Sequence, residues 1–470
     1  MVFSSLNFLY LFLPLVCVLY FIWKNRTWRN AVLLLASILF YAWGEPIYVV
    51  LILCATFIAY MGGILMEYYW KQSHHKAVRW TMYLTVTVLV LNLVVFKYLG
   101  FLTKNLNTIP FISIPVVELT LPIGISFYTF QILSYVIDLY RREVGVQRNY
   151  FYLLLYVSFF PQLIAGPIVR YQTIEQEIYQ RHETWDDVIV GTKRFILGLA
   201  KKVLLANQVA LVAESIYSGS EAIYGTSAMW VAALAYTLQI YFDFSGYSDM
   251  AIGLGRIFGF HFLENFDHPY IACSVTQFWR RWHISLSTWF RDYVYIPLGG
   301  NRTSPGRWLR NILIVWMLTG IWHGAEWNFI LWGLYYGILL VLEKLFLGKL
   351  LSKAPKVFSW VYTFFIVMIG WVLFNQTDFS ALGKCLRTMF IYTPTAWTKV
   401  FTTNMSVFIQ MGYLPIGLIC CFPWSLRCFT GKRDSTLYVL AETGLYFVLL
   451  ILCITFIVSS SYNPFIYFRF

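Results

Sequence analysis

Charged side chains are scarce in this sequence, whereas apolar ones are abundant. Asp, Glu, Lys and Arg make up 12% of the 470 residues, and 59% of the residues are hydrophobic. A soluble globular domain carries about twice that charged fraction. Because the apolar excess runs along nearly the whole chain, the composition excludes a set of soluble domains and predicts a protein embedded in a lipid bilayer.

Short motifs for nucleotide, metal and disulfide chemistry are missing as well. The eight cysteines form no C-x-x-C pair, so the sequence shows no disulfide or zinc framework. It contains no Walker A, H-E-x-x-H, G-x-S-x-G or dinucleotide-binding pattern. These absences argue against an ATP-driven pump and a metalloprotease. Any chemistry would therefore use histidine and a pre-activated donor, without a metal.

Positive charge is in excess, since 35 Lys and Arg against 22 Asp and Glu give a net charge of +13. Nucleic-acid binding is one interpretation of such an excess. The positive-inside rule explains it more simply, because the cytoplasmic loops of membrane proteins collect Lys and Arg. A basic cytoplasmic face also suits an anionic substrate such as a coenzyme A thioester. We therefore expect lipid as the surrounding partner and no nucleic acid.

Apolar stretches long enough to cross a bilayer, which takes about 20 residues, recur along the chain. The candidate spans are 6–23, 28–43, 47–66, 80–100, 121–138, 203–218, 227–252, 357–375, 406–424 and 436–459. Basic residues follow alternate spans, in the segments 24–29, 71–79 and 141–148. This alternation predicts cytoplasmic loops at those segments and an N-terminus on the outer side.

Two further apolar regions, 150–169 and 311–343, have basic residues on both flanks. A full span would place one of those flanks outside, so we expect each region to enter and leave from the cytoplasm. Region 150–169 contains the helix breaker Pro161, and irregular backbone at membrane depth is tolerated only inside protein or beside a cavity. Region 311–343 predicts a helical hairpin with His323 near its tip. Its first helix rises about 16 Å into a hydrocarbon core of about 30 Å, which puts His323 near mid-depth.

Between these regions, residues 253–310 form a long stretch without a span. It carries seven arginines with aromatic residues between them, which predicts a cytoplasmic segment with interfacial amphipathic helices. No internal repeat or soluble catalytic module stands out elsewhere. We therefore expect one membrane domain over residues 1–470 that includes this segment.

Few ionisable side chains are placed for chemistry inside the apolar regions. His323 has apolar and aromatic neighbours, and ionisable groups at membrane depth persist mainly for transport or chemistry. The alternative is a neutral histidine that bonds a neighbouring helix. His283 lies four residues before Ser287, so a helix would place them side by side as a Ser–His nucleophile pair, although such spacing is common by chance. For Asp243 and Asp249, inside an apolar span, we expect structural pairing.

Two motifs identify a family. Residues 279–293 (WRRWHISLSTWFRDY) and 320–324 (GIWHG) resemble the membrane-bound O-acyltransferase family. The branch that the chain resembles is the membrane subunit of alginate O-acetylation. Further matches to that branch lie at 41–46 (YAWGEP), 121–131 (LPIGISFYTFQ), 295–302 (YIPLGGNR) and 463–468 (NPFIYF).

The resemblance implies an all-α polytopic membrane protein with roughly 10–12 transmembrane helices and re-entrant segments around a central funnel. It implies that His323 is the buried catalytic histidine and that His283 matches a second family position, usually His or Asn. In this branch acetyl comes from a cytoplasmic donor, thought to be acetyl-CoA. It is passed outward to a partner with an SGNH-hydrolase-like fold, which modifies an exported polysaccharide. The expected location is the bacterial cytoplasmic membrane.

These expectations combine into a mechanism. Arg280, Arg281 and Arg291 could contact the phosphates of acetyl-CoA, and neutral His323 would accept a proton from the acceptor hydroxyl. Burial favours the neutral imidazole that this role needs. Whether His323 carries the acetyl group itself is left open. One rival is a sibling enzyme that moves D-alanine onto teichoic acid, and the other is a non-catalytic transporter or channel.

Overall fold

The computed structural model describes residues 1–117, 119–164, 166–219, 224–403, 405–423 and 436–459. Within these ranges every regular element is helical and no strand occurs. The residues group into two compact units, which are Met1–Phe195 with Ser248–Leu263 (unit 1) and Ile196–Tyr247 with Glu264–Phe470 (unit 2). The predicted all-α class is confirmed, and a single membrane domain over 1–470 stays a prediction.

Six helices in the described ranges are long and apolar enough to cross a membrane. They are Val49–Lys71, His75–Leu106, Trp185–Tyr217, Trp327–Lys353, Lys356–Asn375 and Thr436–Ser459. Shorter apolar helices cover Asn7–Phe21 and Met405–Cys420. The multi-pass class is therefore confirmed. The count of 10–12 spans stays a prediction, because the predicted spans 28–43, 121–138 and 227–252 form helices outside the six. Residue 424 of the span 406–424 and the motif 463–468 lie outside the described residues.

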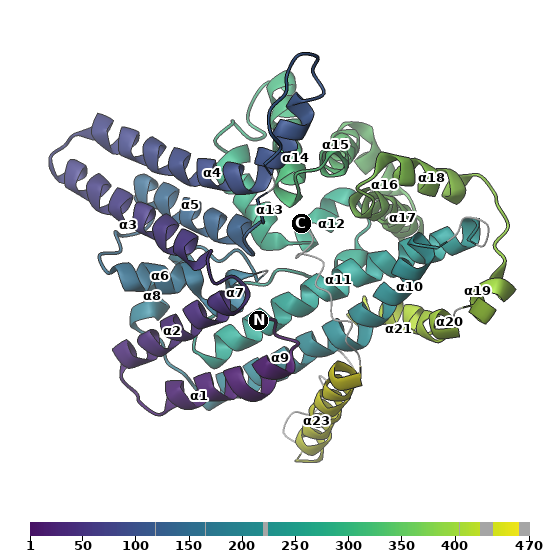
Figure 1. Cartoon of the computed structure of the whole chain (residues 1–470), viewed down its shortest axis with the longest axis horizontal. Coiled ribbons are helices and arrows are strands. Elements are labelled where there is room, and N and C mark those ends of the chain that lie inside the picture. The colour runs from purple at the N-terminus through teal and green to yellow at the C-terminus, as the bar shows by residue number, and fades with distance from the viewer. Residues whose placement is uncertain (118, 165, 220–223, 404, 424–435, 460–470) are drawn as a thin grey trace. The chain divides into compact units, whose positions relative to one another are not determined.

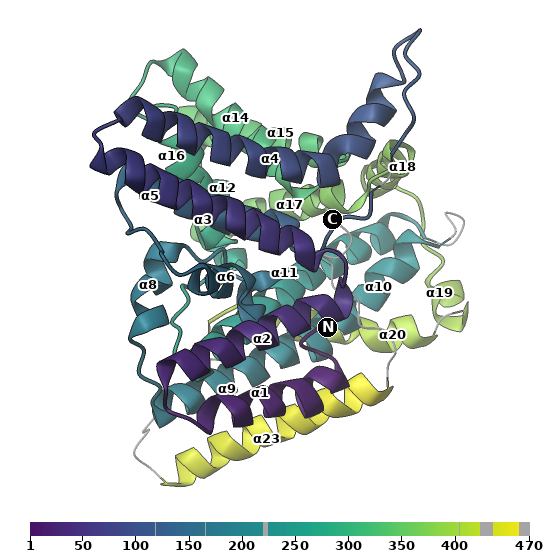
Figure 2. The same ribbon diagram turned by 60° about the vertical axis from the view of Figure 1, so that its left-hand side comes forward.

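Unit 1 contains the N-terminal helices. They are η1 (Asn7–Phe12), α1 (Leu13–Phe21), α2 (Arg26–Gly44), α3 (Val49–Lys71), α4 (His75–Leu106) and α5 (Ile125–Arg141). Helices α3, α4 and α5 pack against one another, and they lie side by side in both ribbon views (Figures 1 and 2). The Asn25 side chain caps α2 by accepting from Trp28 N, and the first helix ends before it.

The apolar region 150–169 is a broken helix, as the sequence predicts. Helix α6 (Tyr150–Ser158) stops at Phe159, and a single turn, α7 (Phe160–Leu163), follows with Pro161 near its start. Most of these side chains are buried in unit 1, where Gln162 Nε2 donates to the Tyr156 carbonyl at 2.5 Å. The break is confirmed, and the re-entrant path through a membrane stays a prediction.

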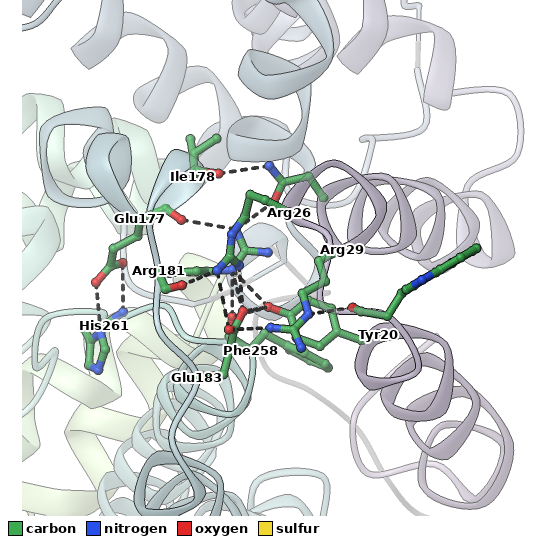
Figure 3. Close-up of polar contacts among 11 residues, drawn as sticks. Tyr20, Arg26, Arg29, Glu177, Ile178, Arg181, Glu183, Phe258 and His261 are labelled. Carbon is green, nitrogen blue, oxygen red and sulfur yellow. Dashed lines mark hydrogen bonds and ion pairs between the residues drawn. The ribbon is translucent and has the colours of Figure 1, made fainter.

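A cluster of three arginines around one glutamate joins distant segments of unit 1 (Figure 3). Arg26 Nη1 lies 2.7 Å from Glu183 Oε1, and Arg29 Nη1 lies 2.5 Å from Glu183 Oε2. Arg181 Nε lies 3.4 Å from Glu183 Oε1, and the Tyr20 hydroxyl also contacts this carboxylate. The cluster thus holds the α1–α2 turn against the segment between α8 (Tyr171–Tyr179) and α9 (Trp185–Ala200).

The same cluster reaches the end of α11 (Thr226–Ile257), whose last residues belong to unit 1. Arg181 Nε donates to the Phe258 carbonyl at 3.0 Å, and its Nη1 donates to Asn30 Oδ1 at 2.7 Å. Nearby, Glu177 accepts from the backbone and ring of His261 (Figure 3). Three chain segments far apart in the sequence are therefore fixed by buried arginine contacts.

Unit 2 begins in the middle of α9 and contains the remaining elements. These are η2 (Lys201–Ala206), α10 (Asn207–Tyr217), most of α11, η3 (Pro269–Ile271), α12 (Val275–Arg281), α13 (Ile284–Phe290), η4 (Arg291–Tyr295), α14 (Pro305–His323), α15 (Trp327–Leu342), η5 (Glu343–Leu347), α16 (Gly348–Lys353), α17 (Lys356–Asn375), α18 (Phe379–Phe390), α19 (Trp397–Thr403), α20 (Met405–Met411), α21 (Tyr413–Cys420) and α23 (Thr436–Ser459). The short helices α12 and α13 lie in the predicted non-spanning stretch, whose cytoplasmic or interfacial location stays a prediction.

The two acidic residues of the α11 span are paired, as expected. In unit 2, Lys202 Nζ lies 2.6 Å from Asp243 Oδ1. In unit 1, Arg194 Nη2 lies 2.8 Å from Asp249 Oδ1. The prediction of structural pairing is confirmed for both carboxylates.

The predicted hairpin over 311–343 is present as α14 and α15, which lie side by side in Figures 1 and 2. Two glycines allow the close approach of these helices. A Cβ at Gly320 would overlap the Phe329 carbonyl, and one at Gly333 would overlap the Trp316 carbonyl. Small residues at helix contacts let backbones meet in this way. The hairpin is confirmed, with His323 as the last residue of its first helix, and its depth in a membrane stays a prediction.

Candidate functional site

A cavity of about 1370 Å³ lies within unit 2. Its wall is built from α12, α13, α14 and the η5–α17 region, and it includes His283, His323, Arg280 and Arg291. Pockets for small ligands hold about 300–1,000 Å³. The cavity is therefore large enough for a long ligand, and it brings two histidines and several cations to one space.

His323 is the last residue of α14, and aromatic rings surround it. The ring centroids of Trp322, Trp332 and Phe374 lie 5.1, 5.0 and 5.2 Å from the imidazole, each at a steep angle to it. The residue is only 6% exposed. Gly324 follows it because a Cβ there would overlap the Phe329 ring. Edge-to-face packing of this kind fixes the imidazole in one orientation at the cavity wall.

His283 sits at the junction of α12 and α13, outside the six candidate spans. Its backbone is left-handed, with φ of 44°, and its side chain is 1% exposed. Its Nδ1 lies 3.1 Å from Asn265 Oδ1, and the Phe244 ring packs on it at 4.6 Å between centroids. Burial lowers the pKa of His283 to about 3, so the imidazole is neutral at physiological pH.

Trp322 links the two histidines. Its ring centroid lies 6.0 Å from that of His283 and 5.1 Å from that of His323. Both imidazoles line the same cavity. The structure therefore brings together the two histidines that the sequence singled out.

The three arginines predicted to bind the donor are placed differently. Arg280 and Arg291 line the cavity. Arg281 lies outside the lining and forms an ion pair with Asp267, with 2.9 Å between Nη1 and Oδ2. Arg291 also contacts its neighbour Asp292 at 2.6 Å. Two of the three guanidinium groups can therefore reach a ligand in the cavity.

Lys344 and Glu343 are site residues that the sequence reasoning missed. Lys344 lines the cavity, where its Nζ donates to Asn301 Oδ1 at 2.8 Å and lies 4.1 Å from the Trp308 ring centroid. Glu343 accepts from Val275 N at 2.6 Å and so caps the first turn of α12. In the sequence, the position of these two residues at the basic end of the predicted hairpin could have indicated that they belong to the site.

The Ser287 hydroxyl does not donate its proton to His283. Its hydroxyl donates to the Trp279 carbonyl at 3.3 Å, and the serine beside the imidazole is Ser285, whose Oγ lies 3.4 Å from Nδ1. Nucleophilic activation of Ser287 by His283 therefore gains no support from the geometry.

The described ranges contain no group of three His, Cys, Asp or Glu side chains placed to hold a metal ion. The wall of the cavity instead combines imidazole, hydroxyl, guanidinium and ammonium groups with aromatic rings. Neutral imidazole can move a proton, and the cations can bind phosphate. These groups suit acyl transfer from a phosphorylated thioester to a hydroxyl.

Comparison with known proteins agrees with this chemistry. Residues 47–377 match the membrane-bound O-acyltransferase family. The probable alginate O-acetylase of Azotobacter vinelandii is 43% identical over 83% of this chain and 78% of its own length. The peptidoglycan O-acetyltransferase of Helicobacter pylori is 31% identical over 100% and 98%, and the teichoic acid D-alanyltransferase of Bacillus subtilis is 29% identical over 55% and 69%. This chain therefore belongs to the membrane-bound O-acyltransferase family, as a multi-pass enzyme of a bacterial membrane.

Proposed function

We propose that this enzyme takes acetyl from cytoplasmic acetyl-CoA and passes it outward for O-acetylation of an extracytoplasmic polysaccharide. The observation that carries the proposal is a single cavity lined by His283, His323 and four cationic side chains. The names of two relatives, an alginate O-acetylase and a peptidoglycan O-acetyltransferase, describe acetylation of a polysaccharide.

The donor would bind through its phosphates at the cationic part of the wall. Arg280 and Arg291 offer guanidinium groups, and Lys344 and Lys356 offer ammonium groups. Guanidinium groups bind phosphate with paired N–H donors, whereas lysine binds it as a point charge. Arg281 would act differently, since its ion pair with Asp267 holds the chain next to His283.

The acyl transfer would use His323 as a general base. The imidazole takes the proton of an acceptor hydroxyl while the hydroxyl oxygen attacks the thioester carbonyl. The new C–O bond forms, the C–S bond breaks, and the coenzyme A thiolate leaves and takes up the proton. A positioned general base accelerates such a step by about 10²–10⁴-fold.

His283 would serve as a second neutral imidazole at the same cavity. Because burial lowers its pKa to about 3, it stays uncharged and can accept a hydrogen bond. We assign it the task of holding the attacking hydroxyl or the donor amide in line with His323. A hydrogen bond of this kind contributes by orientation rather than by proton transfer.

The further route of the acetyl group belongs to the same proposal. A partner with an SGNH-hydrolase-like fold would accept the acetyl group outside the cytoplasm and transfer it to the exported polysaccharide. The match to relatives named for alginate, over most of this chain, supports a polysaccharide acceptor. The SGNH-like partner rests on the resemblance to that branch alone.

D-alanyl transfer to teichoic acid is the rival within the family. The D-alanyltransferase relative covers 55% of this chain, whereas the alginate O-acetylase relative covers 83% at higher identity. This difference favours acetyl transfer. Membership of an acyltransferase family likewise favours catalysis over a transporter or channel.

The test is turnover of acetyl-CoA by the purified protein, together with acetylation of the cell polymer. His323→Ala should abolish both while its membrane level equals that of wild type. The matched control is His182→Ala, because His182 is an exposed histidine of unit 1. Retained acetylation in His323→Ala would remove this residue from the role. Turnover of a D-alanyl carrier protein, or solute flux without acetyl-CoA turnover, would support one of the rivals instead.

A further inference from the structure

The segment 265–267 is joined to the α12–α13 junction by several hydrogen bonds. Ile284 N donates to the Asn265 carbonyl at 2.9 Å, and Asp267 N donates to the Arg281 carbonyl at 3.0 Å. Arg281 Nη1 also donates to the Asp267 carbonyl at 2.9 Å. The segment is therefore fixed against Arg281 and Ile284, which lie on either side of His283 in the sequence.

Within this arrangement the Asn265 side chain is aimed at His283. Asn265 is completely buried, and its Oδ1 lies 3.1 Å from His283 Nδ1. The same oxygen accepts from Ser285 N at 3.2 Å and from Ser285 Oγ at 2.9 Å. The backbone N–H can only donate, so the amide atom that faces it must be the oxygen. Because that oxygen can only accept, the His283 Nδ1 atom next to it must carry a proton.

We propose that Asn265 is a positioning residue that fixes His283 as its Nδ1–H tautomer, so that Nε2 is the hydrogen-bond acceptor at the cavity. A neutral imidazole has one donor and one acceptor nitrogen, and the bond made by one nitrogen decides the state of the other. The consequence for acyl transfer rests on the proposed function. The tautomer itself is a property of the protein without substrate.

The backbone and the neighbouring ring support the same orientation. His283 has a left-handed backbone, which is uncommon for residues other than glycine and persists where the surroundings enforce it. The bond from Ile284 N to Asn265 helps to enforce it. Phe244 of α11 packs perpendicular to the imidazole, at 87°. The imidazole can therefore flip only if these contacts are broken.

The first arm of the test is nitrogen NMR of the full-length protein, labelled with ¹⁵N-histidine and reconstituted in lipid, with His283→Gln to assign the signal. In wild type, Nδ1 of His283 should carry the proton and Nε2 should not. Asn265→Leu should lose this preference, whereas Asn265→Asp, which keeps an acceptor oxygen, should retain it. The matched control is Asn311→Leu, another completely buried amide of unit 2, which should leave the signal unchanged.

The second arm measures acetyl-CoA turnover by the same proteins. Asn265→Leu should lower kcat about 10- to 100-fold, by analogy with the range found for groups that orient metal-bound histidines, with little change in KM for acetyl-CoA. Asn265→Asp should restore most of the kcat. A merely structural role would lower the amount of folded protein and would leave kcat per folded molecule unchanged.

The outcomes separate the two proposals. A proton on Nε2 in wild type, or an unchanged tautomer in Asn265→Leu, would overturn the assignment of Asn265, whatever the enzyme turns over. Absence of acetyl-CoA turnover in wild type would instead overturn the proposed function, and the NMR arm would still decide the tautomer.

Discussion

Lys202 Nζ lies 2.6 Å from Asp243 Oδ1, and the two side chains are only 5% and 2% exposed. Removing one partner of a buried ion pair leaves a buried charge and costs about 3–5 kcal/mol. We therefore expect Lys202→Met and Asp243→Leu each to lower the melting temperature strongly. The double variant should recover most of the loss, because apolar groups can replace a buried pair. Thermal unfolding in detergent measures all three, and a double variant as unstable as the singles would contradict this view of the pair.

The contact between Gly320 and Gly333 predicts unequal effects of added methyl groups on the hairpin. Gly320→Ala would push α15 away from α14, since its Cβ overlaps the Phe329 carbonyl. Overpacking of this kind costs about 1–3 kcal/mol, and the shift of His323 should also lower acetyl-CoA turnover. Gly306→Ala is the control in the same helix, because a Cβ there meets nothing within 4 Å. It should be neutral or slightly stabilising. Equal effects of the two substitutions would argue against tight packing at Gly320.

The arginine cluster of unit 1 predicts a dependence of stability on acid. Burial raises the pKa of Glu183, but the bonds from Arg26 and Tyr20 outweigh it and lower the pKa to about 2, from a usual 4.5. A carboxylate with a lowered pKa stabilises the fold above its unfolded-state pKa, and that stability is lost as the pH falls through the folded-state value. Glu183→Gln should therefore melt well below wild type at neutral pH. The difference should shrink between about pH 4.5 and pH 2.

The control for this pH series is Glu143→Gln, an exposed carboxyl of the same unit. It should change the melting temperature little at any pH, because exposed charges contribute little to stability. If the difference in melting temperature between wild type and Glu183→Gln stayed constant from neutral pH to pH 2, the charge of the Glu183 carboxylate would not contribute to stability.

The placement of the arginines predicts two kinds of effect on the reaction. Arg280→Ala and Arg291→Ala remove cations from the cavity wall, so they should raise KM for acetyl-CoA while kcat changes less. Losing one charge-assisted bond to phosphate corresponds to about 1.5–3 kcal/mol. Steady-state kinetics at two salt concentrations would measure this, since added salt should shrink the difference.

Arg281→Ala should behave differently, because its guanidinium binds Asp267. We expect a lower kcat with a nearly unchanged KM, through movement of the segment next to His283. Asp267→Asn removes the other half of the ion pair and should produce the same pattern. A rise in KM for Arg281→Ala as large as that for Arg280→Ala would instead return Arg281 to the phosphate site.

The hairpin and the position of His323 could be predicted from sequence because they depend on local patterns. Two apolar runs with basic flanks define α14 and α15, and His323 is the last residue of the first helix. The break after Ser158 is equally local, since Pro161 marks it. The type and the approximate position of an element follow from such apolar periodicity and from helix-breaking residues.

Other parts depend on contacts between distant segments, which no local pattern encodes. Arg26 and Arg29 looked like ordinary cytoplasmic charges, yet both bind Glu183 across more than 150 positions of sequence. Asn265 lies in the stretch 253–310 that the sequence leaves without a span, and only folding brings its oxygen to His283. Lys344 reaches the cavity because η5 continues α15. In each case the role is set by a partner whose position the sequence does not give.

The two helices of the hairpin touch through main-chain atoms at Gly320 and Gly333. Because no side chain lies between the helices at this point, we expect α14 and α15 to move together. A movement of α14 that carries the His323 imidazole toward or away from a substrate should then displace α15 as well. Spectroscopic labels on the two helices would consequently report one shared motion, with their mutual separation constant throughout the catalytic cycle.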